Sequence, residues 1–194
     1  MDVGRALMGG DGLAPTLLVA MPQMLDPNFE RAVVLLCKHD EEGALGFIVN
    51  RPSEMTTAEL LSFEPPLADD RALTIWEGGP VSQERGWLIT RVEPEGESIP
   101  ICEGVWLSSS QAHLRQVLED EQADLGPESS RLLLGYAGWG PGQLDQELLE
   151  STWLTAPVDP MTIFHGPPET LWERVIRGIG VDPFQITAAP GSIH

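Results

Sequence analysis

Residues 32–49 read AVVLLC KHDEEG ALGFIV, which is two apolar runs on either side of a short charged segment. Neither run alternates apolar with polar residues, as a strand with one solvent-exposed face would. Asp40-Glu41-Glu42-Gly43 is typical of a turn, because glycine readily adopts the left-handed conformation that such turns need. The stretch therefore predicts a central hairpin whose strands are covered on both faces.

The sequence on both sides of this hairpin predicts short strands interleaved with helices. The predicted strands cover residues 17–21, 73–76, 87–90, 105–107, 131–137, 152–155 and 161–164. The predicted helices cover residues 56–62, 111–120, 142–150 and 167–178. The strands in the first part of the chain are expected to pair antiparallel, and those in the later part to form a mixed arrangement. This order favours an α+β fold over a doubly wound parallel sheet.

The composition limits the class of protein. The chain has 194 residues, with 20 Gly, 17 Pro, 11 Lys and Arg and 30 Asp and Glu, so its formal net charge is −19. These values exclude collagen, a coiled coil, a disulfide scaffold and a basic nucleic-acid binder. No apolar run approaches the roughly 20 residues of a membrane helix, and no export signal is evident. We therefore expect a soluble, acidic, cytoplasmic protein with one domain at 13–187, flexible ends at 1–12 and 188–194, and no membrane partner.

The two cysteines and four histidines offer little chemistry. Cys37 and His39 lie two apart and would share a strand face, as a nucleophile and its base require. The apolar strand favours another interpretation, in which Cys37 packs in the core and His39 caps the hairpin turn, bonding a carboxylate. Cys37 and Cys102 are predicted to stay reduced. The histidines are too scattered for a metal site, so neither a metal nor a cofactor is predicted.

Several short motifs occur in a characteristic order along the chain. They are LVAMP at 18–22, DPNF at 26–29, GALG at 43–46, NRP at 50–52, GGPV at 78–81, GYAGW at 135–139 and GQL at 142–144. With this spacing, residues 13–185 resemble the bacterial YqgE/AlgH family. The resemblance implies a single α+β domain, with a bent, mostly antiparallel sheet curling toward a pseudo-barrel and helices packed outside. It implies no established activity and no catalytic residue, although some members carry the label of transcriptional regulator of alginate production.

The glycine-rich segment 138–142 is the most informative local feature. It joins a predicted buried strand to a helix and can present backbone N–H groups to an anion. No Lys-Ser/Thr follows the last glycine, however, and Asp145 and Glu147 would repel a phosphate. The other interpretation is a tight structural corner, in which Gly140→Ala costs about 1 kcal/mol if the φ of Gly140 is positive. Trp139 has glycines on both sides, so we expect an exposed or half-exposed indole.

The candidate ligand- or partner-binding residues follow from these patterns. They are Gly138, Trp139, Gly140, Gly142, Gln143, His39 and Asn50. The sequence favours a non-enzymatic binding or regulatory module that acts through contacts with a protein or small ligand. The alternatives are an enzyme with a cleft near residues 138–143 and a transcriptional regulator. Direct nucleic-acid binding is disfavoured by the net charge of −19.

Overall fold

A computed structural model describes residues 12–60, 72–94, 96–120 and 129–183. The strands are β1 (Thr16–Ala20), β2 (Val33–Asp40), β3 (Gly43–Ile48), β4 (Pro52–Thr56), β5 (Thr74–Glu77), β6 (Val81–Thr90), β7 (Ile99–Cys102), β8 (Val105–Ser108), β9 (Ser130–Trp139) and β10 (Trp153–Ala156). The helices are α2 (Thr57–Leu60), α3 (Gln111–Glu119), α4 (Gln143–Leu149), α5 (Pro160–Phe164) and α6 (Pro168–Gly178). No helix in these ranges has the length and apolarity needed to cross a membrane.

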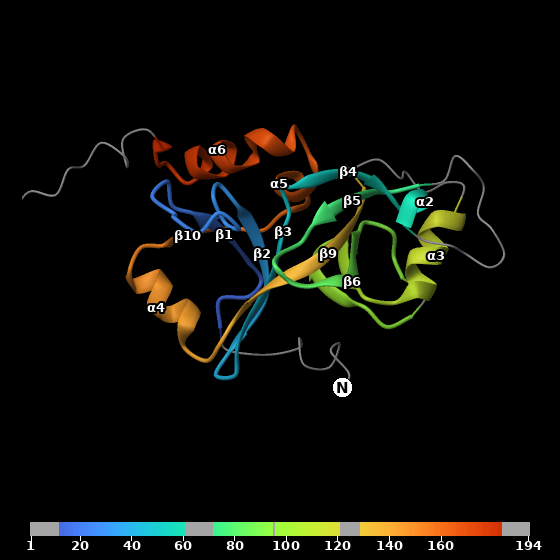
Figure 1. Cartoon of the computed structure of the whole chain (residues 1–194), viewed down its shortest axis with the longest axis horizontal. Coiled ribbons are helices and arrows are strands. Elements are labelled where there is room, and N and C mark those ends of the chain that lie inside the picture. Colours follow the sequence, from blue (N-terminus) through green and yellow to red (C-terminus); the bar gives the residue numbers. More distant parts are fainter. Residues whose placement is uncertain (1–11, 61–71, 95, 121–128, 184–194) are drawn as a thin grey trace, which may run out of the picture.

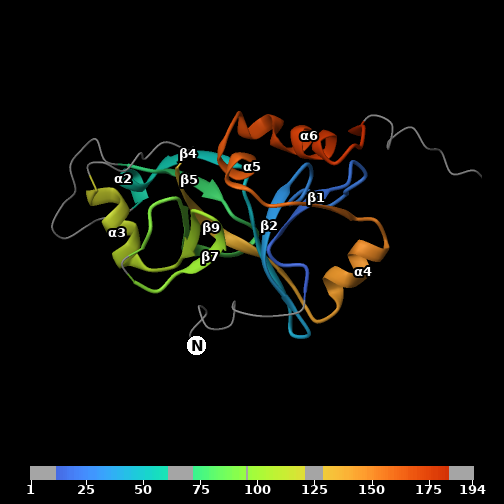
Figure 2. The same cartoon turned by 180° about the vertical axis from the view of Figure 1, so that it is seen from behind.

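The ten strands form one open, strongly bent sheet (Figures 1 and 2). Its main path runs β10-β1-β2-β3-β9-β6-β8-β7, and β4 and β5 join it through β9. The β5–β9 pair is parallel, whereas the other pairs are antiparallel. The single α+β domain with a mostly antiparallel sheet is therefore confirmed. The expected flexible ends lie outside the described residues, apart from Gly12.

The central hairpin is confirmed, and its two faces enter different cores. Alternate residues of β2 divide between them, with Leu35 in one cluster and Leu36 in the other. The first cluster includes Leu171 and Ile176 of α6, and the second includes Leu144 of α4. Figure 1 shows α6 and α4 on different sides of this part of the sheet. Both faces are covered, which explains why the hairpin sequence lacks a polar period.

The predicted strand at 161–164 is wrong, because this segment is the helix α5. Asp159 caps the helix, accepting hydrogen bonds from the backbone N–H of Thr162 at 2.8 Å and from its hydroxyl at 2.6 Å. Pro160 suits the first turn of a helix, where no N–H is needed. The adjacent buried residues Ile163 and Phe164 resembled a covered strand. For the predicted helix at 56–62, the structure places α2 at Thr57–Leu60, and residues 61–62 lie outside the described ranges.

The connection between β5 and β6 crosses over β9. Trp76 of β5 and Trp87 of β6 both pair with Leu133, so β5 and β6 must lie on opposite edges of β9. The intervening chain passes close to the β9 backbone at Gly135, whose φ is +73°. A Cβ at Gly135 would meet the carbonyl oxygen of Gly79, and one at Gly79 would meet the backbone of Tyr136. Only glycine allows the two chains to approach this closely.

Arg131 of β9 is buried and connects several neighbouring elements. Its guanidinium donates to the carbonyl of Val49 at 2.6 Å and to that of Phe164 at 3.3 Å. It also lies 4.1 Å from the ring centroid of Trp76. Burial, and then the charge of Arg174, lower the pKa of Arg131 to about 10, so it stays charged at neutral pH. The side chain thus joins β9, the end of β3 and α5.

Candidate functional site

Trp139 is buried, so the expected exposed indole is wrong. Only 7% of its surface is accessible. β9 extends through Trp139, and the indole packs against Phe29 at 6.3 Å and Trp153 at 5.9 Å between ring centroids. The flanking glycines offer no local packing, but side chains distant in sequence supply it.

Glu147 of α4 connects the two indoles. Its Oε2 accepts hydrogen bonds from Nε1 of Trp139 at 2.9 Å and from Nε1 of Trp153 at 2.7 Å. Its Oε1 accepts from Nε2 of Gln143 at 2.9 Å, and Oε1 of Gln143 accepts from the N–H of Gly140 at 3.1 Å. Gln143, a candidate binding residue, therefore helps to hold α4 against β9. This role of Glu147 is not among the sequence-based predictions, although the spacing of Gln143 and Glu147 is that of neighbours on a helix face.

His39 lies on the α4 side of the hairpin. Its Nε2 is 3.4 Å from Oδ1 of Asp145, and its Nδ1 accepts from the backbone N–H of Leu13 at 3.3 Å. The predicted contact with a carboxylate is confirmed, but the predicted capping of the hairpin turn is wrong, because both ring nitrogens face partners outside the turn. His39 therefore helps to attach α4 and the segment before β1 to the hairpin.

Cys37 and His39 do not share a face, contrary to the expectation from their spacing. The pairing of β2 with β3 shifts register between Leu36 and Lys38, as a β-bulge does. Cys37 therefore lies in the first core cluster, whereas Ala44, which pairs with His39, belongs to the second. The bulge separates the two side chains and removes the nucleophile–base interpretation.

Asn50 lies outside the glycine-rich corner at residues 138–142 and bonds to the chain before β2 and at its start. Its Oδ1 accepts from the N–H of Val33 at 2.9 Å, and its Nδ2 donates to the carbonyl of Arg31 at 2.9 Å. The neighbouring Arg51 donates to the carbonyls of Asn28 at 2.6 Å and Glu30 at 3.0 Å. Together they hold the loop that carries Phe29 against Trp139.

An open depression of about 410 Å³ lies beside the hairpin tip and the end of β9. We call it the hairpin hollow, and its lining residues are Lys38, Glu42, Gly43, Ala44, Leu45, Val81, Tyr136, Gly138 and Trp139. Of the predicted residues, it brings together Gly138 and Trp139. Gly140, Gly142 and Gln143 belong to the adjoining corner, and neither His39 nor Asn50 lines the hollow.

The charged groups of the hollow and the neighbouring hairpin tip pair with one another. Lys38 Nζ lies 3.0 Å from Oδ2 of Asp40 and 3.2 Å from Oε2 of Glu42. The hydrogen bond between Lys38 and Asp40 raises the pKa of the lysine and lowers that of the carboxyl, so both are charged at neutral pH. Lys38 is therefore unsuited to act as a base. Among the described residues, no group of three or more His, Cys, Asp or Glu could hold a metal ion.

The corner glycines differ in what they tolerate. Gly142 has a φ of +70°, whereas Gly140 is not among the positive-φ residues. A Cβ would meet nothing within 4 Å at Gly142 and only Gln143 Oε1, at 3.9 Å, at Gly140. We therefore expect Gly142→Ala to lower the free energy of unfolding by about 1 kcal/mol and Gly140→Ala to leave it within about 0.5 kcal/mol. Urea unfolding of both variants measures this, and equal losses would contradict the backbone explanation.

The two thiols should react at very different rates. Both are free, Cys37 being buried and Cys102 partly exposed. Burial raises the pKa of each thiol, and the charge of Asp159 raises that of Cys102 further. Since the thiolate reacts, we expect iodoacetamide at pH 8 to label Cys102 at least about 100-fold faster than Cys37. Mass spectrometry of the native protein measures both rates, and unfolding in urea should make them similar. A Cys37–Cys102 crosslink or equal native rates would contradict this.

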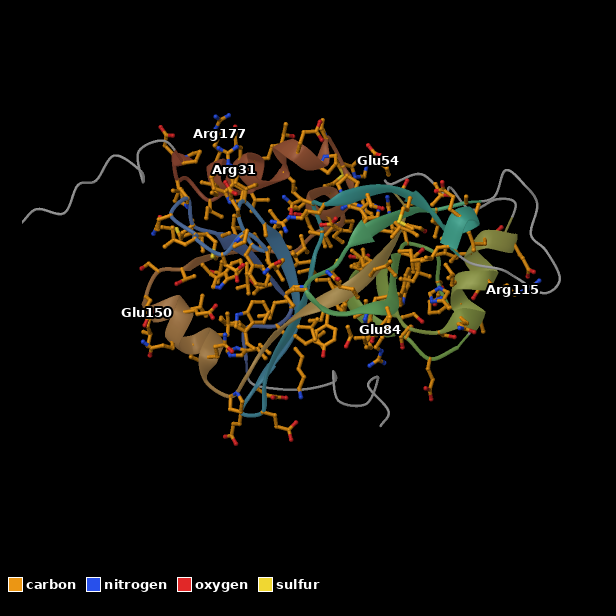
Figure 3. The ribbon with its side chains drawn as sticks, in the orientation of Figure 1. Arg31, Glu54, Glu84, Arg115, Glu150 and Arg177 are labelled. Carbon is orange, nitrogen blue, oxygen red and sulfur yellow. The ribbon has the colours of Figure 1, made fainter. Side chains whose placement is uncertain are left out.

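The described cations are divided between distant parts of the molecule. Arg174 and Arg177 belong to α6 and Arg31 lies over Trp172 of that helix, whereas Arg115 lies on α3 at the far end of the molecule (Figure 3). Lys38 and Arg115 pair with carboxylates, and Arg131 is buried. With a net charge of −19, this arrangement is unsuited to a phosphate backbone.

We therefore expect no duplex DNA binding at about 0.15 M salt. Fluorescence anisotropy with labelled genomic fragments should give no saturation at micromolar protein. Lowering the salt to roughly 0.02 M should still fail to produce tight binding, because the field around the protein repels phosphate. A micromolar or tighter dissociation constant at the higher salt would show that the arginines act together.

Comparison with known proteins gives consistent results. The family described as AlgH-like matches residues 17–184. A UPF0301 protein of Xanthomonas euvesicatoria is 44% identical over 183 residues, which cover 92% of this chain and 95% of the relative. The solution structure of the AlgH protein from Pseudomonas aeruginosa has a TM-score of 0.71 and 35% identity, covering 96% of this chain and 100% of that one. A crystal structure from Corynebacterium diphtheriae, with 22% identity and a TM-score of 0.67 over 91% and 92% of the two chains, shares the fold.

Proposed function

The chain belongs to the AlgH-like family, and from that premise we propose that it is a binding module that contacts a partner protein through the hairpin hollow. The family name and the UPF0301 relatives specify no reaction, so the argument depends on the surface itself. The hollow is the place where predicted site residues meet an accessible depression.

The exposed and half-buried apolar residues in the hollow carry this proposal. Val81 is 38% exposed, and Leu45 and Tyr136 are half-buried against the core. Tyrosine is enriched at interface cores because it combines a large apolar ring with a polar tip. A depression framed by these three side chains suits an apolar anchor of a partner.

The polar groups near the corner support a binding role over an enzymatic one. Gln143 and Glu147 bond to each other, to two indoles and to the backbone of Gly140. Groups engaged in this way stabilise the corner and are unsuited to converge on a substrate. Regulation by this protein would then operate through protein contacts, which suits a chain with a net charge of −19.

The test is retention of a partner in cells of the source bacterium. The tagged chain is purified under mild conditions and its associated proteins are identified by mass spectrometry. Val81→Asp introduces a charge into the hollow and should remove the associated partner. Met161→Asp introduces the same charge at a residue of α5 that is 61% exposed and lies far from the hairpin tip, and it should leave the partner in place (Figure 1).

Unchanged association in Val81→Asp, or equal loss in both variants, would contradict the proposal. Both variants change surface residues, so their thermal stability should stay close to that of the parent. Measuring Tm for each separates loss of the contact from loss of the fold.

A further inference from the structure

The two edges of β9 are occupied to different extents. Gly78, directly after β5, donates its N–H to the carbonyl of Leu134 and accepts from the N–H of Ile48. β5 and the end of β3 thus line the same edge of β9, and β3 continues along it by pairing with residues 137–139. On the other edge, the β6 ladder ends where Val81 pairs with Tyr136. Within the described residues, no strand pairs with that edge beyond Tyr136.

The backbone N–H and C=O of Gly138 face this open edge. A Cβ at Gly43 of β3 would meet the carbonyl oxygen of Trp139, so that oxygen points toward β3. Successive residues of a strand direct their N–H and C=O groups to opposite edges. Those of Gly138 therefore point away from β3. Gly138 is exposed and has no side chain, and it lines the hairpin hollow.

The pairing of β6 with β9 ends at Val81 for a structural reason. Pro80 has no N–H to donate to a ladder, and Gly79 carries the chain across β9 instead of along it. The place beside Gly138, where a longer β6 would run, adjoins the hollow, which is lined by Val81, Tyr136 and Gly138 together with residues of β2 and β3. A donor, an acceptor and a depression therefore lie together at the end of a buried strand.

We propose that an extended segment of a partner protein adds to the open edge of β9 at Gly138 and continues the row of β6. This inference rests on the proposed function and specifies its binding mode. Strand addition uses backbone hydrogen bonds for affinity and alternate side chains for specificity. Here the apolar side chains of the segment would contact Val81 and Tyr136.

The charge beside the hollow specifies the other side chains of the segment. The hairpin tip carries Asp40, Glu41 and Glu42 against Lys38 alone, and Glu42 is 84% exposed. The whole chain carries a net charge of −19. Lysine or arginine is therefore expected at alternate positions of the partner segment.

The probe is a fluorescein-labelled nine-residue peptide of alternating valine and lysine, titrated by anisotropy against the full chain. Two matched analogues carry N-methyl groups on all interior valines or on all interior lysines. Only one edge of an added strand faces β9, so one analogue should bind at least tenfold more weakly than the parent peptide. The other should bind with an affinity within twofold of the parent peptide.

The charge argument is tested with variants of the protein. Glu42→Lys should weaken binding of the parent peptide at least fivefold. Glu54→Lys makes the same charge change on β4, away from the hairpin tip, and should leave the affinity unchanged (Figure 3).

Two results would overturn strand addition. One is an unmethylated peptide that does not bind, and the other is two analogues that change affinity equally. The second result, if Val81→Asp still abolishes peptide binding, would leave the hollow as a binding surface without a β-ladder. The partner assay in cells tests the proposed function separately, because it does not depend on how the partner backbone lies.

Discussion

Replacing Trp139 with alanine is expected to lower the free energy of unfolding by about 3 kcal/mol or more. The indole is 7% exposed and packs between Phe29 and Trp153. Its removal leaves a cavity and takes one donor from the carboxylate of Glu147. For a chain of this size, the loss corresponds to a fall in Tm of roughly 6–12 °C, measurable by circular dichroism.

Two controls show what the loss consists of. Trp106→Ala removes a half-buried tryptophan of β8 and should cost less. Trp139→Phe keeps much of the apolar contact but removes the hydrogen bond to Glu147, so it should fall between the parent and the alanine variant. If Trp139→Ala melted within about 2 °C of the parent, the indole would contribute little to stability, and the exposed binding platform would be the better description.

Replacing Gly135 with alanine is expected to lower the free energy of unfolding by about 2–4 kcal/mol. A φ of +73° costs an L-residue about 1 kcal/mol. The added Cβ would also overlap the carbonyl oxygen of Gly79, and relieving such overpacking costs typically about 1–3 kcal/mol. Urea unfolding monitored by fluorescence measures the change.

Gly86→Ala is the matched control. Gly86 also lies on a strand that pairs with β9, but its added Cβ would lie 3.4 Å from Leu132 Cδ1, in ordinary contact. Its stability should change by less than about 0.5 kcal/mol. Gly135→Asn separates the two causes, because asparagine tolerates a positive φ but still carries a Cβ. Equal stability of Gly135→Ala and Gly86→Ala would contradict the close crossing.

The predicted binding site stays a prediction, whereas the expected exposure of Trp139 was wrong. Gly138 and Trp139 line an accessible depression. The glycines around Trp139 suggested exposure because local sequence offered the indole nothing to pack on. Phe29, Glu147 and Trp153 supply that packing from a loop, a helix and an edge strand. Contacts between such distant segments have no local pattern.

The sequence by itself determined the elements that depend on neighbouring residues. The unbroken apolar runs at 32–37 and 44–49 predicted a hairpin covered on both faces, and burial on both faces is what removes the polar period. The helices at Gln111–Glu119, Gln143–Leu149 and Pro168–Gly178 followed from apolar spacing and terminal residues. In contrast, the order and spacing of the short motifs indicated the family but did not show what they do.

Only the tertiary structure decided how these elements meet. It showed that Gly79 and Gly135, separated by 56 positions (135 − 79), lie in contact where one chain crosses another. It also showed that a bulge at Cys37 separates this thiol from His39, and that β6 stops short of Gly138. A bulge or an open edge is a property of two paired strands, because each depends on how the backbone hydrogen bonds of both chains are arranged. The sequence of one segment does not specify which segment it pairs with, so these features are seen only in the folded chain.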